Sequence, residues 1–282
     1  PDKLLFHASS LIRKGCRIAA IKSGSSESGS RAASSHTGAI ATSDSAVEAL
    51  FRKAGIVRCF SREELTTVGC IFTCLPATQA STLLQQPASL SKFAIVTHAG
   101  GPGVMLTDAL SKGGLQVPQF VGEAAEELKS KLYPGASVAN PIDILATGTP
   151  EHLATAIDYC ENHFDEVDAI MVIFGTPGLV KLYETYDVLH KKILECKKPI
   201  FPILPSLHTA GPEVAEFLKK GHVNFSDEVT LAVSLSRIIA TPNPARPEIE
   251  WFGVDLPRIR DIIASIAEDG KVSTQQDSTL LV

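Results

Sequence analysis

Short apolar strands alternate with helical segments along most of this 282-residue chain, and this alternation constrains the fold more than any other feature. An apolar run at 93–98 leads directly into glycines and then into a helical pattern at 104–111. Two further strands are predicted at 169–174 and 200–204, with a long helical pattern at 180–196 between them. Parallel strands need a crossover that returns over the sheet. The pattern therefore predicts an α/β fold in which helices cover both faces of a parallel sheet.

The N-terminal quarter of the chain predicts a smaller unit of the same kind. Helices and strands alternate there as helix 3–13, strand 17–21, helix 43–55, strand 57–60 and helix 63–74. Residues 22–35 are almost all Ser, Gly and Ala, and this composition predicts a loop. The loop ends at His36, which makes this histidine the first candidate for a functional side chain.

Changes in composition along the chain predict its domain boundaries. A stretch rich in Pro, Ala, Thr, Ser and Gln at 76–90 is expected to be a linker. It separates a first domain at 1–75, which is predicted to be incomplete because the chain enters it within a helix–strand unit, from a second domain at 91–241. A hinge helix at 256–268 and a polar tail are expected within 242–282.

Charge and composition argue against several classes of function. The formal net charge is -5 and the Lys and Arg residues form no run, so affinity for nucleic acid or for an anionic membrane is not expected. No apolar run reaches the roughly 18 residues of a membrane span. The six cysteines include no C-x-x-C pair, which is typical of a protein in the reducing cytoplasm. The histidines lack metal-ligand spacing, and no metal site is expected.

Three short motifs occur in order, each between a predicted strand and helix: Ser-His-Thr-Gly-Ala at 35–39, Thr-His-Ala-Gly-Gly-Pro-Gly-Val at 97–104 and Asn-Pro-Ile-Asp at 140–143. The first resembles the phosphohistidine loop of the ADP-forming acetyl-CoA synthetases and, more distantly, of succinyl-CoA synthetase. The other two resemble the phosphate-facing turn and the N-P-x-D loop of the second flavodoxin-like domain of these enzymes. The resemblance covers about residues 1–240 and implies two flavodoxin-like, succinyl-CoA synthetase-like domains.

The resemblance implies a part of an acid–thiol ligase, an acyl-CoA synthetase of the nucleoside-diphosphate-forming kind. Such an enzyme interconverts acyl-CoA, ADP and phosphate with acid, CoA and ATP through an acyl phosphate and a phosphohistidine. CoA and ADP or ATP with Mg²⁺ are then expected to bind mainly outside this chain, which begins at Pro1. A CoA-binding domain and an ATP-grasp domain or subunit, in the same or a separate chain, are the expected partners. An oligomer is also expected.

The resemblance makes His36 the phosphoryl acceptor, with Thr37 and Gly38 as supporting neighbours. A neutral imidazole is a competent nucleophile near pH 7 because its ordinary pKa is about 6.5. Small, flexible residues on both sides suit a carrier that visits two sites. Without this motif, a histidine in a Ser-rich loop would be interpreted as a polar loop residue that has no function.

Backbone amides of Gly100, Gly101 and Gly103 are predicted to bind phosphate, because unpaired amides at the start of a helix attract anions. The alternative is an ordinary glycine turn. Asn140 and Asp143 are expected to support this turn through hydrogen bonds to backbone amides, or else to form a simple turn of their own.

His98 occupies a place where Asn is commoner in the resembling family, and it is expected to be a polar neighbour of the anion site and not a second carrier. Two other classes of protein remain as alternatives. A regulatory or scaffold module of a protein-acetyltransferase-like protein would have no reason to keep His36. A flavodoxin-type redox carrier would need aromatic residues beside the flavin, and the single Trp and four Tyr do not suggest them.

Overall fold

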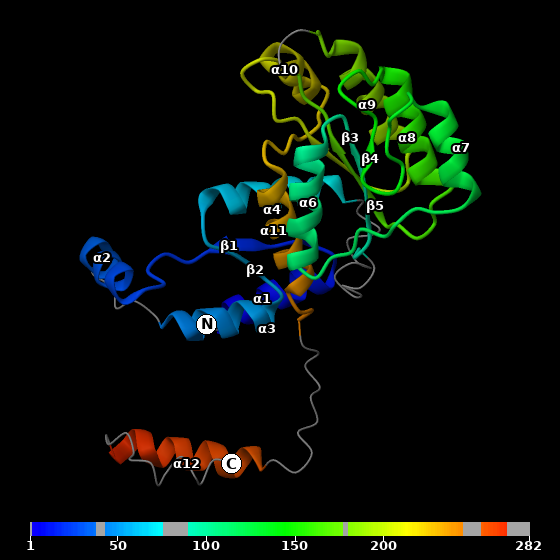
Figure 1. Ribbon diagram of the computed structural model, residues 1–282. Helices are drawn as coiled ribbons and strands as arrows, with labels where there is room; N and C mark the ends of the chain where they lie inside the picture. Colours follow the sequence, from blue (N-terminus) through cyan, green and yellow to red (C-terminus); the bar gives the residue numbers. More distant parts are fainter. Residues whose placement is uncertain (1, 38–42, 76–89, 177–179, 245–254, 270–282) are drawn as a thin grey trace. The chain divides into compact units, whose positions relative to one another are not determined.

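The computed structural model describes residues 2–37, 43–75, 90–176, 180–244 and 255–269 (Figure 1). The chain forms two compact units, Pro1–Pro244 and Ala245–Val282. The helix predicted at 256–268 in the second unit is present as α12 (Leu256–Asp269).

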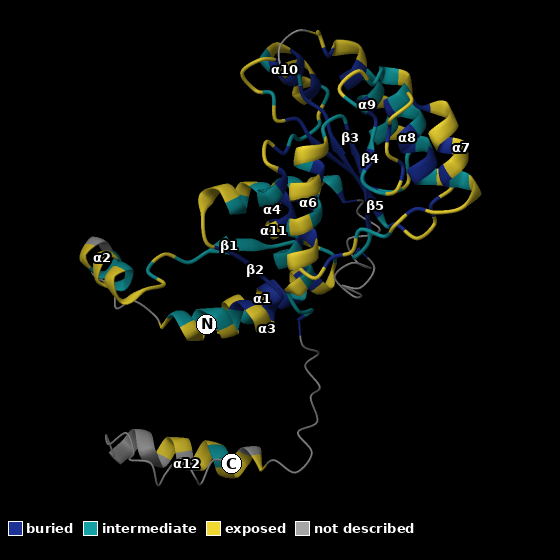
Figure 2. Ribbon diagram, viewed as in Figure 1, coloured by how far each residue is buried: buried dark blue, intermediate teal, exposed yellow. Residues whose placement is uncertain are grey.

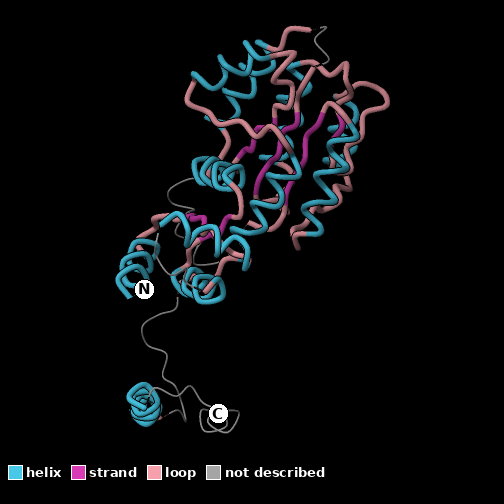
Figure 3. The backbone as a smooth tube through the Cα atoms, turned by 90° about the vertical axis from the view of Figure 1, so that its left-hand side faces the viewer, coloured by secondary structure: helices cyan, strands magenta, loops and turns pink. Residues whose placement is uncertain are grey.

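Two parallel sheets are described in the first unit. The smaller pairs β1 (Ala19–Ile21) with β2 (Val57–Cys59). The larger has the order β4-β3-β5-β6. Its strands are β3 (Phe93–Thr97), β4 (Ile142–Asp143), β5 (Ala169–Ile173) and β6 (Ile200–Ile203). Every neighbouring pair in it is parallel. Figure 3 shows the strands of this sheet side by side in magenta, with helices around them. The predicted α/β class with parallel sheets is confirmed.

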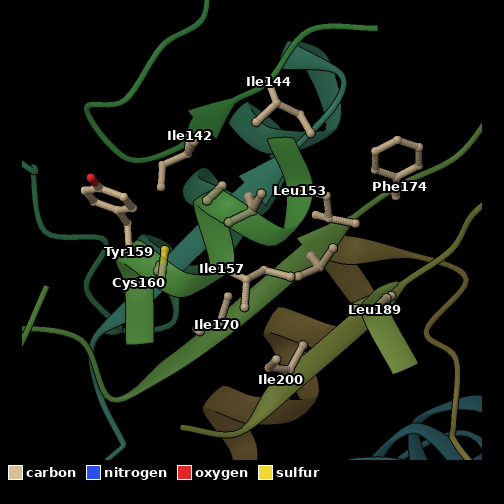
Figure 4. Packing of buried hydrophobic residues seen from close by; sticks show 14 of the residues in the cluster. Ile142, Ile144, Leu153, Ile157, Tyr159, Cys160, Ile170, Phe174, Leu189 and Ile200 are labelled. Carbon is tan, nitrogen blue, oxygen red and sulfur yellow. The ribbon is translucent and has the colours of Figure 1, made fainter. Parts of the chain in front are cut away.

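Alternating side chains of β3 divide the core of the larger sheet in two. Ala94 and Val96 lie in one buried cluster with four helices: α7 (Glu123–Lys131), α8 (Pro150–Asn162), α9 (Tyr183–Glu195) and α10 (Gly211–Lys219). Figure 4 shows part of this cluster around Ile157, which comes from α8. Phe93 and Ile95 pack in the other cluster with three helices: α4 (Arg62–Cys74), α6 (Gly100–Lys112) and α11 (Glu228–Ala240). Helices therefore cover both faces, as the crossover argument requires.

Helices α4 and α11 also contact the smaller sheet. Val68 of α4 packs with Val57 and Cys59 of β2, whereas Ile71, one turn further on, belongs to the cluster of the larger sheet. Ile238 of α11 packs against both clusters. Helices α1 (Asp2–Arg13) and α3 (Asp44–Ala54) pack together in a third buried cluster, against which Ala20 of β1 also packs. The apolar faces of α4 and α11 thus pack against both sheets.

The loop predicted at 22–35 is wrong from residue 27 onward, because Glu27–Thr37 forms the helix α2. This helix buries little of its surface (Figure 2). Its stabilising contacts are local. The Arg31 guanidinium lies 2.7 Å from the Glu27 carboxylate one turn earlier, and the Ser26 hydroxyl accepts a hydrogen bond from the Gly29 amide at 3.1 Å. A helix of this kind carries no apolar periodicity, so the sequence pattern does not reveal it.

Candidate functional site

The carboxyl ends of β3 and β5 meet at the point where the strand order of the larger sheet reverses. The chain leaves β3 to form β4 on one side and then returns to form β5 on the other. In open α/β sheets, ligands bind outside the carboxyl ends of the strands at such a point. The motif at 97–104 lies here, directly after β3.

The turn after β3 is shaped by Thr97, whose side chain is buried. Its hydroxyl donates a hydrogen bond to the Ala99 carbonyl at 2.8 Å and accepts one from the Ala99 amide at 3.0 Å. Ala99 is the N-cap residue of α6, and no side chain caps this helix. The helix therefore begins at Gly100 and not at 104 as predicted, so the glycines form its first turn.

The early start of α6 changes which glycine amides are available to an anion. The Gly103 amide donates to the Ala99 carbonyl at 3.5 Å, and Pro102 has no N–H. Within the described parts of the chain, the amides of Gly100 and Gly101 have no acceptor, and both residues are exposed. Of the three glycine amides, that of Gly103 thus bonds within the helix and those of Gly100 and Gly101 do not, and phosphate binding at this turn stays a prediction.

Gly103 has a packing role instead. A Cβ at this position would lie 3.1 Å from Thr97 Cγ2 and 3.6 Å from Pro141 Cβ. The absence of a side chain lets α6 approach the end of β3 and the loop before β4. By contrast, a Cβ at Gly101 would meet nothing within 4 Å. Gly103 is therefore needed for the close approach of α6 to the end of β3, whereas Gly101 lies at an open surface.

Asn140 joins the loop before β4 to the central strand β3. Its Oδ1 accepts a hydrogen bond from the Ile95 amide at 2.9 Å, and its Nδ2 donates to the carbonyls of Phe93 and Pro118, each at 2.9 Å. Its φ of 62° lies in the left-handed region, which Asn tolerates better than most residues. These bonds occupy its side chain, so Asn140 connects the loop before β4 to strand β3.

Asp143 places a carboxylate beside the start of α6. Its Oδ1 accepts a hydrogen bond from the Leu145 amide at 2.9 Å. Its Oδ2 would lie 3.3 Å from a Cβ at Gly100, so this oxygen adjoins the first residue of the helix. A negative charge at a helix N-terminus is stabilising, and it also competes with any other anion for that position.

His98 lies between the ends of β3 and β5. Its ring stacks on Phe174 with centroids 4.7 Å apart, and its Nδ1 is 3.3 Å from the Ile173 carbonyl oxygen and 3.4 Å from the Gly175 amide nitrogen. Burial lowers the pKa of His98, while the Ile173 carbonyl and the charge of Asp143 act in the opposite direction. The net effect favours a neutral ring.

Gly175 and Ser206, which no sequence motif indicated, shape the loops beside His98. A Cβ at Gly175 would lie 2.4 Å from Ser206 Oγ, and that hydroxyl accepts a hydrogen bond from the Thr176 amide at 2.7 Å. The two loops after β5 and β6 can meet this closely only because residue 175 has no side chain. A glycine directly after a predicted strand was the signal that could have indicated such an approach.

Of the His36 motif, the structure describes the backbone of His36 and Thr37, which end helix α2. Gly38 lies outside the described residues. The structure thus brings Asp143 beside Gly100 at the start of α6, ties Asn140 to strand β3, and describes the backbone of His36 as part of helix α2.

The described ranges contain no group of three or more His, Cys, Asp or Glu side chains arranged to hold a metal ion. No helix in them has the length and apolar character needed to cross a bilayer.

Over part of its length, the chain is similar to known enzymes. Residues 1–72 match the family described as "Succinyl-CoA ligase like flavodoxin domain". The chain is 35% identical over 150 residues to an ADP-forming acetate–CoA ligase of Methanocaldococcus jannaschii, an alignment that covers 53% of this chain and 20% of the relative. It is 38% identical over 140 residues to the alpha subunit of ADP-forming acetate–CoA ligase II of Pyrococcus furiosus, covering 50% of this chain and 28% of the relative. The predicted resemblance to ADP-forming acyl-CoA synthetases is thereby confirmed.

A solved structure supports the fold. The dinucleotide-forming acetyl-coenzyme A synthetase 1 of Ca. Korarchaeum cryptofilum, in complex with phosphate and ADP, matches with a TM-score of 0.70 at 24% identity. The match covers 83% of this chain and 48% of that chain. The chain therefore spans less than half the length of these relatives.

Proposed function

We propose that this chain carries the phosphohistidine and one phosphate-binding turn of a nucleoside-diphosphate-forming acyl-CoA synthetase. The reaction would interconvert acyl-CoA, ADP and phosphate with acid, CoA and ATP. One observation carries the proposal: the Ser-His-Thr-Gly-Ala sequence at 35–39 lies within the 72 residues that match the succinyl-CoA ligase like domain.

In the proposed chemistry, phosphate first displaces CoA from the acyl-CoA and gives an acyl phosphate. A ring nitrogen of neutral His36 then attacks the phosphorus, the bond from phosphorus to the acyl oxygen breaks, and the carboxylate leaves. In the last step, a β-phosphate oxygen of ADP attacks the phosphorus, the N–P bond breaks, and ATP and free His36 result. The exposed amides of Gly100 and Gly101 would hold phosphate oxygens at the start of α6.

The remaining parts of the enzyme are proposed to lie outside residues 1–282. These are a CoA-binding domain and an ATP-grasp domain or subunit, which would hold ADP or ATP with Mg²⁺. Within the chain, the proposed division is a histidine-bearing part at 1–75, a linker at 76–90, a phosphate-binding part at 91–241 and a hinge and tail at 242–282. An oligomer in the cytoplasm is proposed, and the free thiols of all six cysteines are consistent with that compartment.

ATP formation from acetyl-CoA, ADP and phosphate tests the proposed division of labour. The 282-residue chain alone is expected to show background rates, because ADP and Mg²⁺ need a binding unit of their own. Addition of the CoA-binding and ATP-grasp parts of a relative should produce ATP in a His36-dependent way. Turnover by the isolated chain, or turnover that survives loss of His36, would contradict the proposal.

Removal of the negative charge of Asp143 tests the anion site. We expect Asp143→Asn to bind inorganic phosphate at least about threefold more tightly in calorimetric titration, because like charges repel at this range. Asn keeps an acceptor for the Leu145 amide. Asp108→Asn is the matched control, since Asp108 is an exposed carboxylate further along the same helix α6. Equal affinities for both variants and the unchanged chain would place the anion away from Gly100 and Gly101.

A further inference from the structure

Charged side chains join the two ends of the segment that carries His36. Lys22 is the first residue after β1, and Asp44 is the first residue of α3. Residues 23–43 run between them and include His36. The Lys22 ammonium lies 3.4 Å from Asp44 Oδ1, and it also donates a hydrogen bond to the Gly24 carbonyl. The start and the end of the segment are thus held at one point.

Arg58 of β2 anchors this point to the smaller sheet. One of its guanidinium nitrogens donates to the same Asp44 Oδ1 at 2.6 Å, and the other donates to Glu48 Oε2 at 2.8 Å. The Arg58 side chain is only 8% exposed. The hydrogen bond from Arg58 lowers the pKa of the Asp44 carboxyl, so this group is ionised at neutral pH. The Asp44 carboxylate of α3 therefore binds both Lys22, the residue after β1, and Arg58 of β2.

Burial distinguishes these contacts from ordinary surface ion pairs. An exposed pair contributes little because water and salt screen it. Here, the Lys22 side chain is 14% exposed and that of Arg58 is 8% exposed, whereas the Asp44 carboxylate that they share is 32% exposed, so the two ion pairs are partly buried. Glu48 shares Arg58 with Asp44, but its contact joins α3 to β2 and does not involve Lys22. Asp44 is the residue that links both ends of the segment.

We propose that Lys22, Asp44 and Arg58 form an ionic clasp that fixes the base of residues 23–43, with Asp44 as a positioning residue for His36. The clasp holds the two ends of residues 23–43 beside the smaller sheet. It raises the frequency with which His36 meets an acyl phosphate, because a tethered group acts at a high effective concentration. The catalytic part of this inference rests on the proposed function, whereas the structural part does not.

Proteolysis of the 282-residue chain tests the clasp without any enzymatic activity. Trypsin cuts after Lys22, at the start of the segment, only when this side chain leaves the Asp44 carboxylate and enters the protease. We expect Asp44→Asn to be cut there at least about fivefold faster than the unchanged chain, and Glu48→Gln to be cut less than about twofold faster. Both variants lose one carboxylate that binds Arg58, so the control matches the charge change and the location. Equal cleavage of the two variants would overturn the clasp.

Phosphoryl transfer provides the second readout. In the assembled enzyme, Asp44→Asn should slow the appearance of label on His36 at least about fivefold and leave the final extent unchanged, while Asp44→Glu should restore most of the rate. A reduced extent with an unchanged rate would contradict a positioning role. Label that persists without His36 would defeat the proposed function and leave the proteolysis result standing, so the two failures are distinguishable.

Discussion

Replacement of His36 by asparagine is expected to reduce phosphoryl label on the chain to background, and ATP formation in the assembled enzyme by roughly a thousandfold or more. The reason is chemical: the asparagine amide lacks a nucleophilic ring nitrogen, so the phosphoryl group has no acceptor at the end of α2. Incorporation of labelled phosphate from acyl-CoA and phosphate, or from ATP and Mg²⁺, measures the loss directly.

Two further histidine variants serve as controls for this result. His7→Asn changes an exposed histidine of α1 and should keep full labelling. His98→Asn removes the ring that stacks on Phe174 and should also keep the label, because His98 is assigned as a neighbour of the anion site and not as a second carrier. Equal labelling of His36→Asn and the unchanged chain would refute the assignment, and loss of label in His98→Asn alone would transfer it to that residue.

Asn140→Ala is expected to lower the free energy of unfolding by about 3–5 kcal/mol. The variant loses three hydrogen bonds to backbone groups and leaves the Ile95 amide and the Phe93 carbonyl of the buried strand β3 without these partners. Alanine also tolerates a φ of 62° less well than asparagine does. Denaturant unfolding followed by circular dichroism gives the difference.

The matched control for this loss is Asn162→Ala at the end of α8. Asn162 is exposed and its Nδ2 donates one hydrogen bond, to the Asp158 carbonyl, so we expect a loss below about 1 kcal/mol. A similar small loss at both positions would mean that Asn140 is a surface turn residue and not a structural connection to β3.

The apolar strands of the larger sheet could be predicted because their signal is local and strong. Residues 93–97, 169–173 and 200–203 are each buried along their whole length, and a continuous apolar run is the pattern of a strand covered on both faces. Strand β4 escaped prediction, because it has only two residues, Ile142 and Asp143, and too short a length to show alternation.

The start of α6 was misplaced for a different reason. Glycines lower helix propensity, so the pattern favoured a turn at 100–103 and a helix from 104. The buried Thr97 hydroxyl and the close approach of Gly103 to Pro141 set the actual start at Gly100. Pro102, in the first turn, was the available signal, because proline is tolerated there.

The role of Asn140 could not be read from the sequence, where a turn initiator and a supporting residue looked equally plausible. The deciding contact is with Phe93, 47 positions earlier in the chain. The same holds for Lys22, Asp44 and Arg58, which are far apart in sequence and meet only because β1 and β2 pair in parallel and α3 packs against β2. Long-range contacts of this kind leave no local pattern.

Location of the phosphoryl group tests the central claim most directly. The assembled enzyme is labelled with acyl-CoA and phosphate, digested under alkaline conditions and mapped by mass spectrometry, with ³¹P NMR to identify the bond. We predict a phosphoryl group on a ring nitrogen of His36 that is labile in acid and stable in base. An acid-stable phosphate on one of the serines around it, or label on any other histidine of the chain, would contradict the account.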